Sequence, residues 1–269
     1  MLPAALRTAG LALLATAAPA LAHFSILLPE TTPDSPGEPA VWRFFTGHPY
    51  ECELLDTPEP ESVRVRHPDG RTWTDLKPRP AEIAPPDDPA GSKITVQGFE
   101  FRPDTRGCHL VCVTTPRTFD PHENTVVQDS VLCPLRVGTR NGWDRPADTP
   151  IELVPLTMPF GLEPGFAVRF QLRLHGRPVA GAEVEIEKYH RRRPQTLPAD
   201  ESLITRVVKT DDHGCLVATL DEPGWWVLCG SAEDGRATHE GREHPLVRRA
   251  LYWLCVHPRT DTDDEGRTR

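Results

Sequence analysis

Residues 166–186 read FAVRFQLRLHGRPVAGAEVEI, and this stretch decides the fold. Val168, Phe170 and Leu172 alternate with polar residues, which is the period of two expected for a β-strand with one buried face. Gly-Arg-Pro at 176–178 then makes a turn, and a second alternating run follows it. The stretch therefore predicts two adjacent strands joined by a short loop.

The same pattern continues on both sides of this stretch. The segments TDDHGCLVATLDEPGWWVLCG (210–230) and RRALYWLCVHP (248–258) add further strands separated by turns. Thirty prolines, nineteen glycines and the lack of any long helical periodicity also favour many short strands. Turn residues separate the strands predicted before residue 138, which are 24–28, 40–46, 62–67, 93–101, 108–115 and 125–137.

We predict an all-β fold of two antiparallel, immunoglobulin-like β-sandwich domains in tandem. The first domain covers residues 23–140 and the second covers 151–257. The polar segment GTRNGWDRPADTP (138–150) is interpreted as the linker between them. Residues 77–92 are rich in proline, whose fixed φ disfavours regular structure, so we predict a surface loop there. Residues 258–269 are polar and are expected to form a disordered tail.

The first 22 residues have the pattern of a cleavable export signal. Arg7 precedes an apolar stretch at 11–20, and the triplet Ala-Leu-Ala at 20–22 predicts cleavage before His23. A cut two residues earlier is the rival, and it would leave Leu21 at the front. The apolar stretch is too short to span a bilayer, and no later segment reaches about 18 apolar residues. We therefore expect a periplasmic or secreted protein that does not span the membrane.

Charge and cysteine content restrict the partners and the chemistry. The formal net charge is −9 at pH 7, which disfavours nucleic acid as a partner. Seven cysteines in an exported chain predict disulfides, and the odd number leaves at least one cysteine over.

His23 is the first candidate metal ligand. If cleavage frees it, its α-amine and its imidazole close a small chelate on a divalent metal, and both groups titrate near neutral pH. His48, in the segment TGHPYE, follows a predicted strand and is the best second ligand. Glu51 lies three residues on, where its carboxylate can bind the metal or orient the ring. The alternatives are a terminal histidine left by chance and an ordinary turn histidine before proline.

Two further histidines are weaker candidates for a metal site. His122 lies in the segment FDPHEN, and His239 lies in ATHEGREH, which we interpret as an acidic loop. The second segment does not match the zinc peptidase signature H-E-x-x-H, because Glu243 stands where the second histidine is required. A nucleophile elbow and a phosphate-binding loop are also missing, so the sequence predicts no enzyme.

Two resemblances extend these inferences. The segments PGFAVRFQLRLHGRPVAGAEVEI and TDDHGCLVATLDEPGWWVL resemble the immunoglobulin-like modules of the carboxypeptidase-regulatory and transthyretin-like type. The segments AHFSILLPE, FTGHPYE, GWDRP and IELVPLTMPFGLEPG are similar to a bacterial family of exported proteins often labelled periplasmic components of nickel/cobalt uptake. This resemblance covers nearly all of residues 23–257. It implies a divalent transition metal (nickel, cobalt or copper) as ligand and a membrane metal transporter as partner.

Two functions from different classes stay open. The first is an exported metal-binding protein that presents or buffers metal for an uptake system, using the amine and ring of His23 and a loop histidine. The alternative is a non-catalytic β-sandwich module that binds carbohydrate or protein at the cell envelope. A copper oxidase of the histidine-brace type shares the terminal histidine, but beyond His48 no second histidine pattern supports it.

Overall fold

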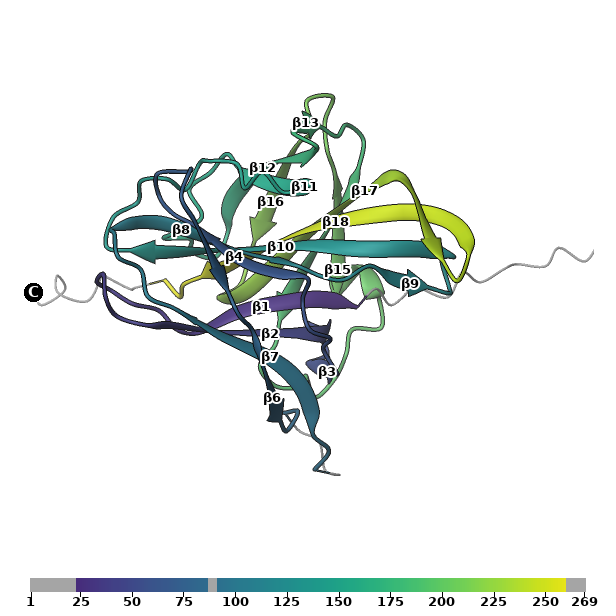
Figure 1. Cartoon of the computed structure of the whole chain (residues 1–269), viewed down its shortest axis with the longest axis horizontal. Helices are drawn as coiled ribbons and strands as arrows, with labels where there is room; N and C mark the ends of the chain where they lie inside the picture. Colours follow the sequence, from purple (N-terminus) through teal and green to yellow (C-terminus); the bar gives the residue numbers. More distant parts are fainter. Residues whose placement is uncertain (1–22, 87–90, 260–269) are drawn as a thin grey trace, which may run out of the picture.

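The computed structural model describes residues 23–86 and 91–259. The predicted export signal (1–22) and most of the predicted tail (260–269) lie outside the described residues. Strands dominate the described chain and form three sheets that stack as three layers (Figure 1). The β-sandwich prediction is therefore confirmed. No helix of the described residues is long and apolar enough to cross a bilayer.

The first sheet contains the start of the described chain. Its strands, in spatial order, are β1 (Phe24–Thr31), β2 (Ala40–His48), β7 (Ile94–Phe101) and β6 (Arg79–Ile83), and β3 (Glu53–Leu55) also pairs with β2. All pairs in this sheet are antiparallel. The prediction of an irregular loop over 77–92 was wrong for residues 79–83. Pro80 is tolerated in β6 because this strand lies at the edge of the sheet.

The middle sheet combines strands from both halves of the chain. Its order is β15 (Thr205–Lys209), β14 (Glu183–Tyr189), β17 (Gly224–His239), β18 (Arg242–Val256), β10 (Thr125–Val137), β8 (Gly107–Thr114), β4 (Ser62–Arg66) and β5 (Trp73–Leu76), with β9 (Thr118–Asp120) paired to β10. The third sheet consists of β11 (Ile151–Pro155), β12 (Phe166–Leu174), β13 (Arg177–Pro178) and β16 (Cys215–Leu220). A short 3-10 helix, η1 (Glu201–Leu203), precedes β15.

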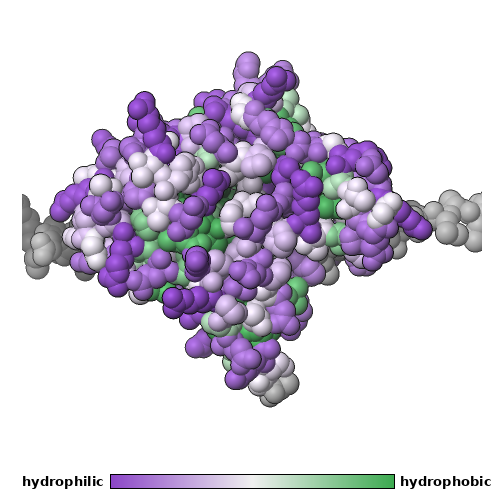
Figure 2. All heavy atoms as spheres, in the orientation of Figure 1, coloured by the Kyte–Doolittle hydropathy of each residue, from purple (hydrophilic) through white to green (hydrophobic). Residues whose placement is uncertain are grey.

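Alternation along the middle strands divides the core into two clusters. Leu251 and Trp253 of β18 face the first sheet, whereas Tyr252 and Leu254 face the third sheet. Successive side chains of a strand point to opposite faces, so one strand contributes to both clusters. The exterior face seen in Figure 2 is largely hydrophilic, with hydrophobic residues showing in separate patches.

The two halves of the chain meet in a parallel strand pair. Residues Val126–Leu132 of β10 pair with Leu246–Tyr252 of β18 in parallel, so the middle sheet is mixed and not purely antiparallel. This pairing makes one continuous sheet from strands on both sides of the predicted linker. The domain boundary between 140 and 151 stays a prediction, and the structure adds that strands from both sides share this sheet.

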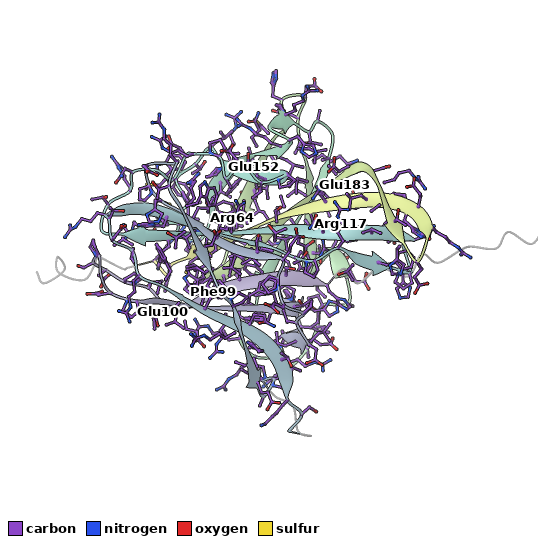
Figure 3. The ribbon with its side chains drawn as sticks, viewed as in Figure 1. Arg64, Phe99, Glu100, Arg117, Glu152 and Glu183 are labelled. Atoms are coloured by element: carbon purple, nitrogen blue, oxygen red, sulfur yellow. The ribbon has the colours of Figure 1, made fainter. Side chains whose placement is uncertain are left out.

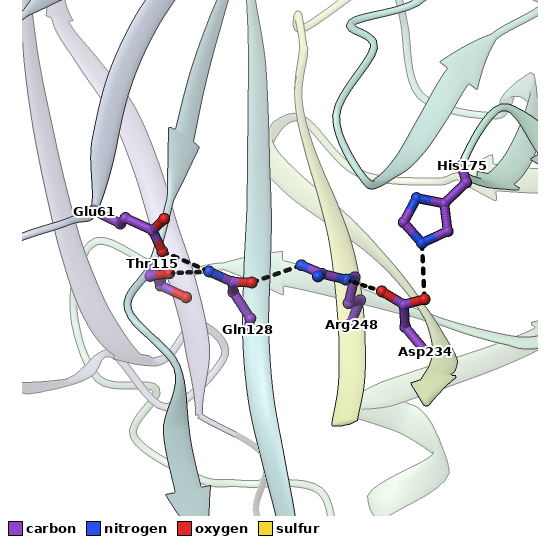
Figure 4. A network of polar contacts seen from close by, with 6 residues as sticks. All are labelled: Glu61, Thr115, Gln128, His175, Asp234 and Arg248. Atoms are coloured by element: carbon purple, nitrogen blue, oxygen red, sulfur yellow. Dashed lines mark hydrogen bonds and ion pairs between the residues drawn. The ribbon is translucent and has the colours of Figure 1, made fainter. Parts of the chain in front are cut away.

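A polar network reinforces this junction across one face of the middle sheet (Figure 4). Gln128 of β10 donates from Nε2 to Glu61 Oε2 over 2.7 Å and accepts at Oε1 from Arg248 of β18 over 2.6 Å. Arg248 also pairs with Asp234 of β17, and His175 Nε2 lies 2.8 Å from the other oxygen of that carboxylate. The network therefore connects residues from both halves of the chain.

The predicted linker is tightly held by buried polar side chains. Arg66 is only 1% exposed, and its guanidinium donates to the carbonyl oxygens of Gly142, Arg145 and Pro146. Glu152, labelled on β11 in Figure 3, accepts from the backbone N–H of Ala147. Residues 142–147 thus have a fixed conformation although they form no strand.

Two further predictions were wrong. No disulfide joins any of the seven cysteines, all of which lie in the described residues. Most of them are buried on strands, where they pack into the core as small apolar residues.

The predicted loop at 237–244 is the tip of the long β17–β18 hairpin. Glu240 and Gly241 both have positive φ (47° and 77°), as a two-residue type I′ turn requires.

Candidate metal centre

The pairing of β1 with β2 brings His23 and His48 together. Phe24 pairs with Gly47 in the antiparallel register, so the preceding residue on β1 falls opposite the following residue on β2. The two imidazole rings lie 4.9 Å apart between centroids, with an interplanar angle of 63°. His48 is buried and His23 is exposed, so the pair lies at the rim of the sheet.

Gly47 is required by the close approach of β3. A Cβ atom at this position would lie 1.9 Å from the carbonyl oxygen of Glu53, far inside van der Waals contact. The absence of a side chain lets β3 pair with the end of β2, where His48 is opposite Glu53. The motif Gly47-His48 thus combines a tight backbone contact with a candidate ligand.

A buried ion pair holds the backbone at His23. Arg249 of β18 donates from Nε and Nη2 to the two oxygens of Asp129, each over 2.7 Å. The same Nη2 donates to the carbonyl oxygen of His23 over 3.0 Å. Ser25 Oγ donates to Asp129 over 2.7 Å, and Trp253 Nε1 donates to the carbonyl oxygen of Ser25. The start of β1 is therefore anchored to two strands of the middle sheet.

The electrostatics favour a neutral His23 ring. Partial desolvation of the ring lowers the pKa of His23, and the adjacent His48 and Arg249 lower it further, whereas Glu53 and Asp120 act in the opposite direction. A metal binds the unprotonated imidazole, so this shift keeps the ligand available at lower pH.

A pocket of about 420 Å³ opens beside the two histidines. His48 and Glu51 line it together with Phe24, and Glu185 and Glu187 of β14 contribute further carboxylates. Glu51 therefore shares a cavity with His48. Apolar and polar residues from the segment around η1 and β15 form the rest of the wall.

Glu187 was missed by the sequence analysis. It alternates with Val184 and Ile186, which predicts a solvated face, yet it is only 3% exposed. Its Oε1 accepts from the backbone N–H of Tyr50 over 2.9 Å, and its Oε2 accepts from Thr205 Oγ1 over 2.8 Å. Glu187 therefore fixes the loop that follows His48.

The other two predicted ligands lie apart from this pair. His122 is exposed in the turn after β9, and Asp120 holds its backbone N–H. His239 lies at the tip of the β17–β18 hairpin and stacks on Phe119 at 4.4 Å between centroids. Within residues 23–86 and 91–259, no group of three or more His, Cys, Asp or Glu side chains has the arrangement of a metal site.

The donor set fits a metal if the amine of His23 is counted. With metal–nitrogen bonds of ~2.0–2.1 Å, the centroids of two imidazoles on one metal lie roughly 4.5–6.5 Å apart. The separation of 4.9 Å is within this range. Imidazole nitrogens suit nickel, copper and zinc, and a terminal amine adds a third nitrogen. Two rings alone make an incomplete site.

Comparison with known proteins gives the family of the chain. No curated protein matches the sequence. Escherichia coli alpha-2-macroglobulin activated by porcine elastase is similar at 15% identity, with a TM-score of 0.25, over 88% of this chain and 20% of that one. The Yersinia pseudotuberculosis adhesin InvE is similar at 11% identity, with a TM-score of 0.21, over 85% of this chain and 58% of that one. The chain thus spans about a fifth of the alpha-2-macroglobulin that it matches. A family model matches residues 20–234, and the protein therefore belongs to the family described as domain of unknown function DUF4198.

Proposed function

We propose that this is an exported protein that binds one divalent transition metal (nickel, cobalt or copper) at His23 and His48. It presents or buffers that metal for a membrane uptake system and is not an enzyme. The observation that carries the proposal is the pair of imidazole rings 4.9 Å apart at the rim of the first sheet.

Cleavage before His23 supplies the missing ligand. The α-amine and the ring of a terminal histidine bind through one chelate, and His48 adds the third nitrogen. This scheme accounts for a two-histidine pair without a third side-chain ligand among the described residues. It also explains why Arg249 and Asp129 hold the backbone at His23, because a terminal residue that moves freely makes a poor chelate.

The pocket beside the pair supports a cation as the ligand. Glu51 lines the cavity next to His48, and a carboxylate at that position raises the local concentration of cations. Glu51 is the nearest in sequence and is proposed to bind the metal as an oxygen ligand or to orient His48. Because His23 is exposed, a bound metal lies where a transporter can reach it.

The test is metal binding by chains that differ only at the N-terminus. The chain beginning at His23 is expected to bind one Ni(II) or Cu(II) in calorimetry and in native mass spectrometry. One added glycine before His23 separates the amine from the ring, and we expect at least a hundredfold loss of affinity. Unchanged tight binding by the extended chain would rule out the terminal site.

Two histidine variants provide the matched comparison. His48→Ala removes the second ring and is expected to weaken binding at least tenfold. His122→Ala changes an exposed histidine outside the pair and is expected to leave the affinity unchanged. Equal losses in both variants would contradict the assignment of His48.

A further inference from the structure

A second pair of histidines lies at the tip of the β17–β18 hairpin. His239 and His244 are on opposite strands and on the same face, because Ala237, two residues before His239, pairs directly with His244. Their ring centroids are 6.3 Å apart. Phe119 of β9 contacts both rings, at 4.4 Å from His239 and 4.7 Å from His244.

This pair is separate from His23 and His48. On β18, His244 shares its face with Arg248, whereas Arg249, which binds the carbonyl of His23, points to the other face. The five residue steps from position 244 to position 249 span roughly 16 Å of strand. The second pair is therefore an independent feature of the molecule.

The interior of this cluster is apolar and leaves one nitrogen unsatisfied. His244 is 9% exposed, and its Nδ1 is enclosed without a hydrogen-bond partner among the described residues. Val126, Ala237 and Leu246 are buried next to Phe119 on the same face. A buried polar atom without a partner is costly, so a ligand for this nitrogen is a physical expectation.

We propose that His239 and His244 bind one monovalent d10 cation, Cu(I) or Ag(I), between their rings and against the face of Phe119. This site is independent of the proposed function at His23.

Three observations select a monovalent cation of low coordination number. Two imidazoles on one metal have centroids roughly 4.5–6.5 Å apart, and the upper end corresponds to nitrogen atoms on nearly opposite sides of the ion. The separation of 6.3 Å is near that end, and linear two-coordination is the preference of Cu(I) and Ag(I). No third His, Cys, Asp or Glu completes a site in the described part of the chain, and divalent ions need more ligands. Phe119 offers a π-face, which attracts a cation.

Silver is the probe, because Ag(I) is stable in air and matches the geometry of Cu(I). The chain starts at His23 with one added glycine, so that the terminal chelate does not compete. It also carries Cys255→Ser, because Cys255 is only partly buried whereas the other cysteines are buried. Burial raises the pKa of Cys108 and of Cys112 to about 12, which keeps these thiols protonated. NMR with labelled histidine and phenylalanine then reports each of these rings separately.

One equivalent of Ag(I) is expected to shift the ring signals of His239 and His244 together with those of Phe119. His239→Ala and His244→Phe are each expected to weaken binding at least tenfold. His213→Ala, in an exposed turn, is expected to bind as the parent does. The proposal is overturned if the first equivalent leaves the signals of the pair unshifted, or if His239→Ala binds silver unchanged. His239 is partly exposed, so its variant decides the test even if His244→Phe does not fold.

Discussion

Glu187 shows how a single residue departs from its local pattern. In the run Glu183-Val184-Glu185-Ile186-Glu187 the apolar residues face the third sheet, and the glutamates face the side of the first sheet. Near β14 a pocket opens on that side, so Glu185 and Glu187 line its wall. Sequence alternation identifies the two faces of a strand, but it does not tell which face a distant sheet covers. His48 was predicted as a ligand from its own segment. Glu187 lines the same pocket but was not predicted, because its segment does not show that the first sheet lies over that face.

Burial of Glu187 predicts a pH-dependent stability. Desolvation raises its pKa from 4.5 to about 7, against the hydrogen bonds from Tyr50 and Thr205. The folded state therefore holds this proton more tightly than the unfolded state. The stability that protonated Glu187 contributes is fully present below pH 4.5 and is lost as the pH rises through about 7. The free energy involved is about 3 kcal/mol.

Glu187→Gln removes this titration but keeps an oxygen to accept from Tyr50. Urea unfolding at pH 4.5 and at pH 8 is expected to show a smaller loss of stability in the variant than in the parent chain. Glu123→Gln, in an exposed turn, is the control and is expected to follow the parent. Identical pH slopes in the parent and in Glu187→Gln would contradict the burial argument.

At the scale of elements, the alternation of apolar and polar residues predicted strands well where one face of the strand is buried. The alternating segment at 166–174 forms β12, and the predicted strand at 125–137 is β10 in full. Predictions failed where a distant neighbour decides. Residues 79–83 form an edge strand because β7 offers a pairing partner, which the local sequence does not show. At the hairpin tip, residues 236–239 pair with residues 242–245 across a two-residue turn, so both strands continue to the tip.

In the candidate metal centre, too, some features could be predicted from the local sequence and others depend on distant residues. His23 and His48 were predicted as ligands from residue type and position, and the β1–β2 pairing places their rings together. The anchoring of His23 by Arg249 and Asp129 joins residues more than a hundred positions apart, so no local pattern indicates it.

Arg66 is expected to stabilise the conformation of the predicted linker. Its guanidinium donates to three carbonyl oxygens of residues 142–146, and no carboxylate is needed because each carbonyl is a strong acceptor. Arg66→Met leaves these oxygens without their donor and is expected to lower the free energy of unfolding by about 2–4 kcal/mol.

Arg64→Met, on the same face of β4, is the control for this variant. Arg64 is half-buried and stacks on Trp73, so the expected loss is about 1 kcal/mol or less. Urea unfolding of both variants measures the difference, and equal losses would contradict the role of Arg66.

At the scale of the molecule, the middle sheet decides how the chain unfolds. Seven residues of β10 pair with β18 in parallel, and the core on one side of the sheet contains Trp42 from the first half and Trp253 from the second. Parallel pairing needs buried faces on both sides, which the first and third sheets provide. The Gln128–Arg248–Asp234 contacts add a polar connection across the same junction (Figure 4).

This arrangement predicts one cooperative unfolding transition. If strands from both halves share a sheet and a core, neither half keeps its buried surface when the other unfolds, so both lose structure together. Labelling with 5-fluorotryptophan makes the test specific, because Trp42 and Trp253 are both fully buried and report on different halves. The fluorine signals of the two residues are expected to disappear at the same urea concentration. Two separate midpoints would instead show that the predicted domains, 23–140 and 151–257, unfold independently. Arg248→Leu is expected to shift both signals to a lower midpoint in parallel, because it breaks the polar connection without changing either core.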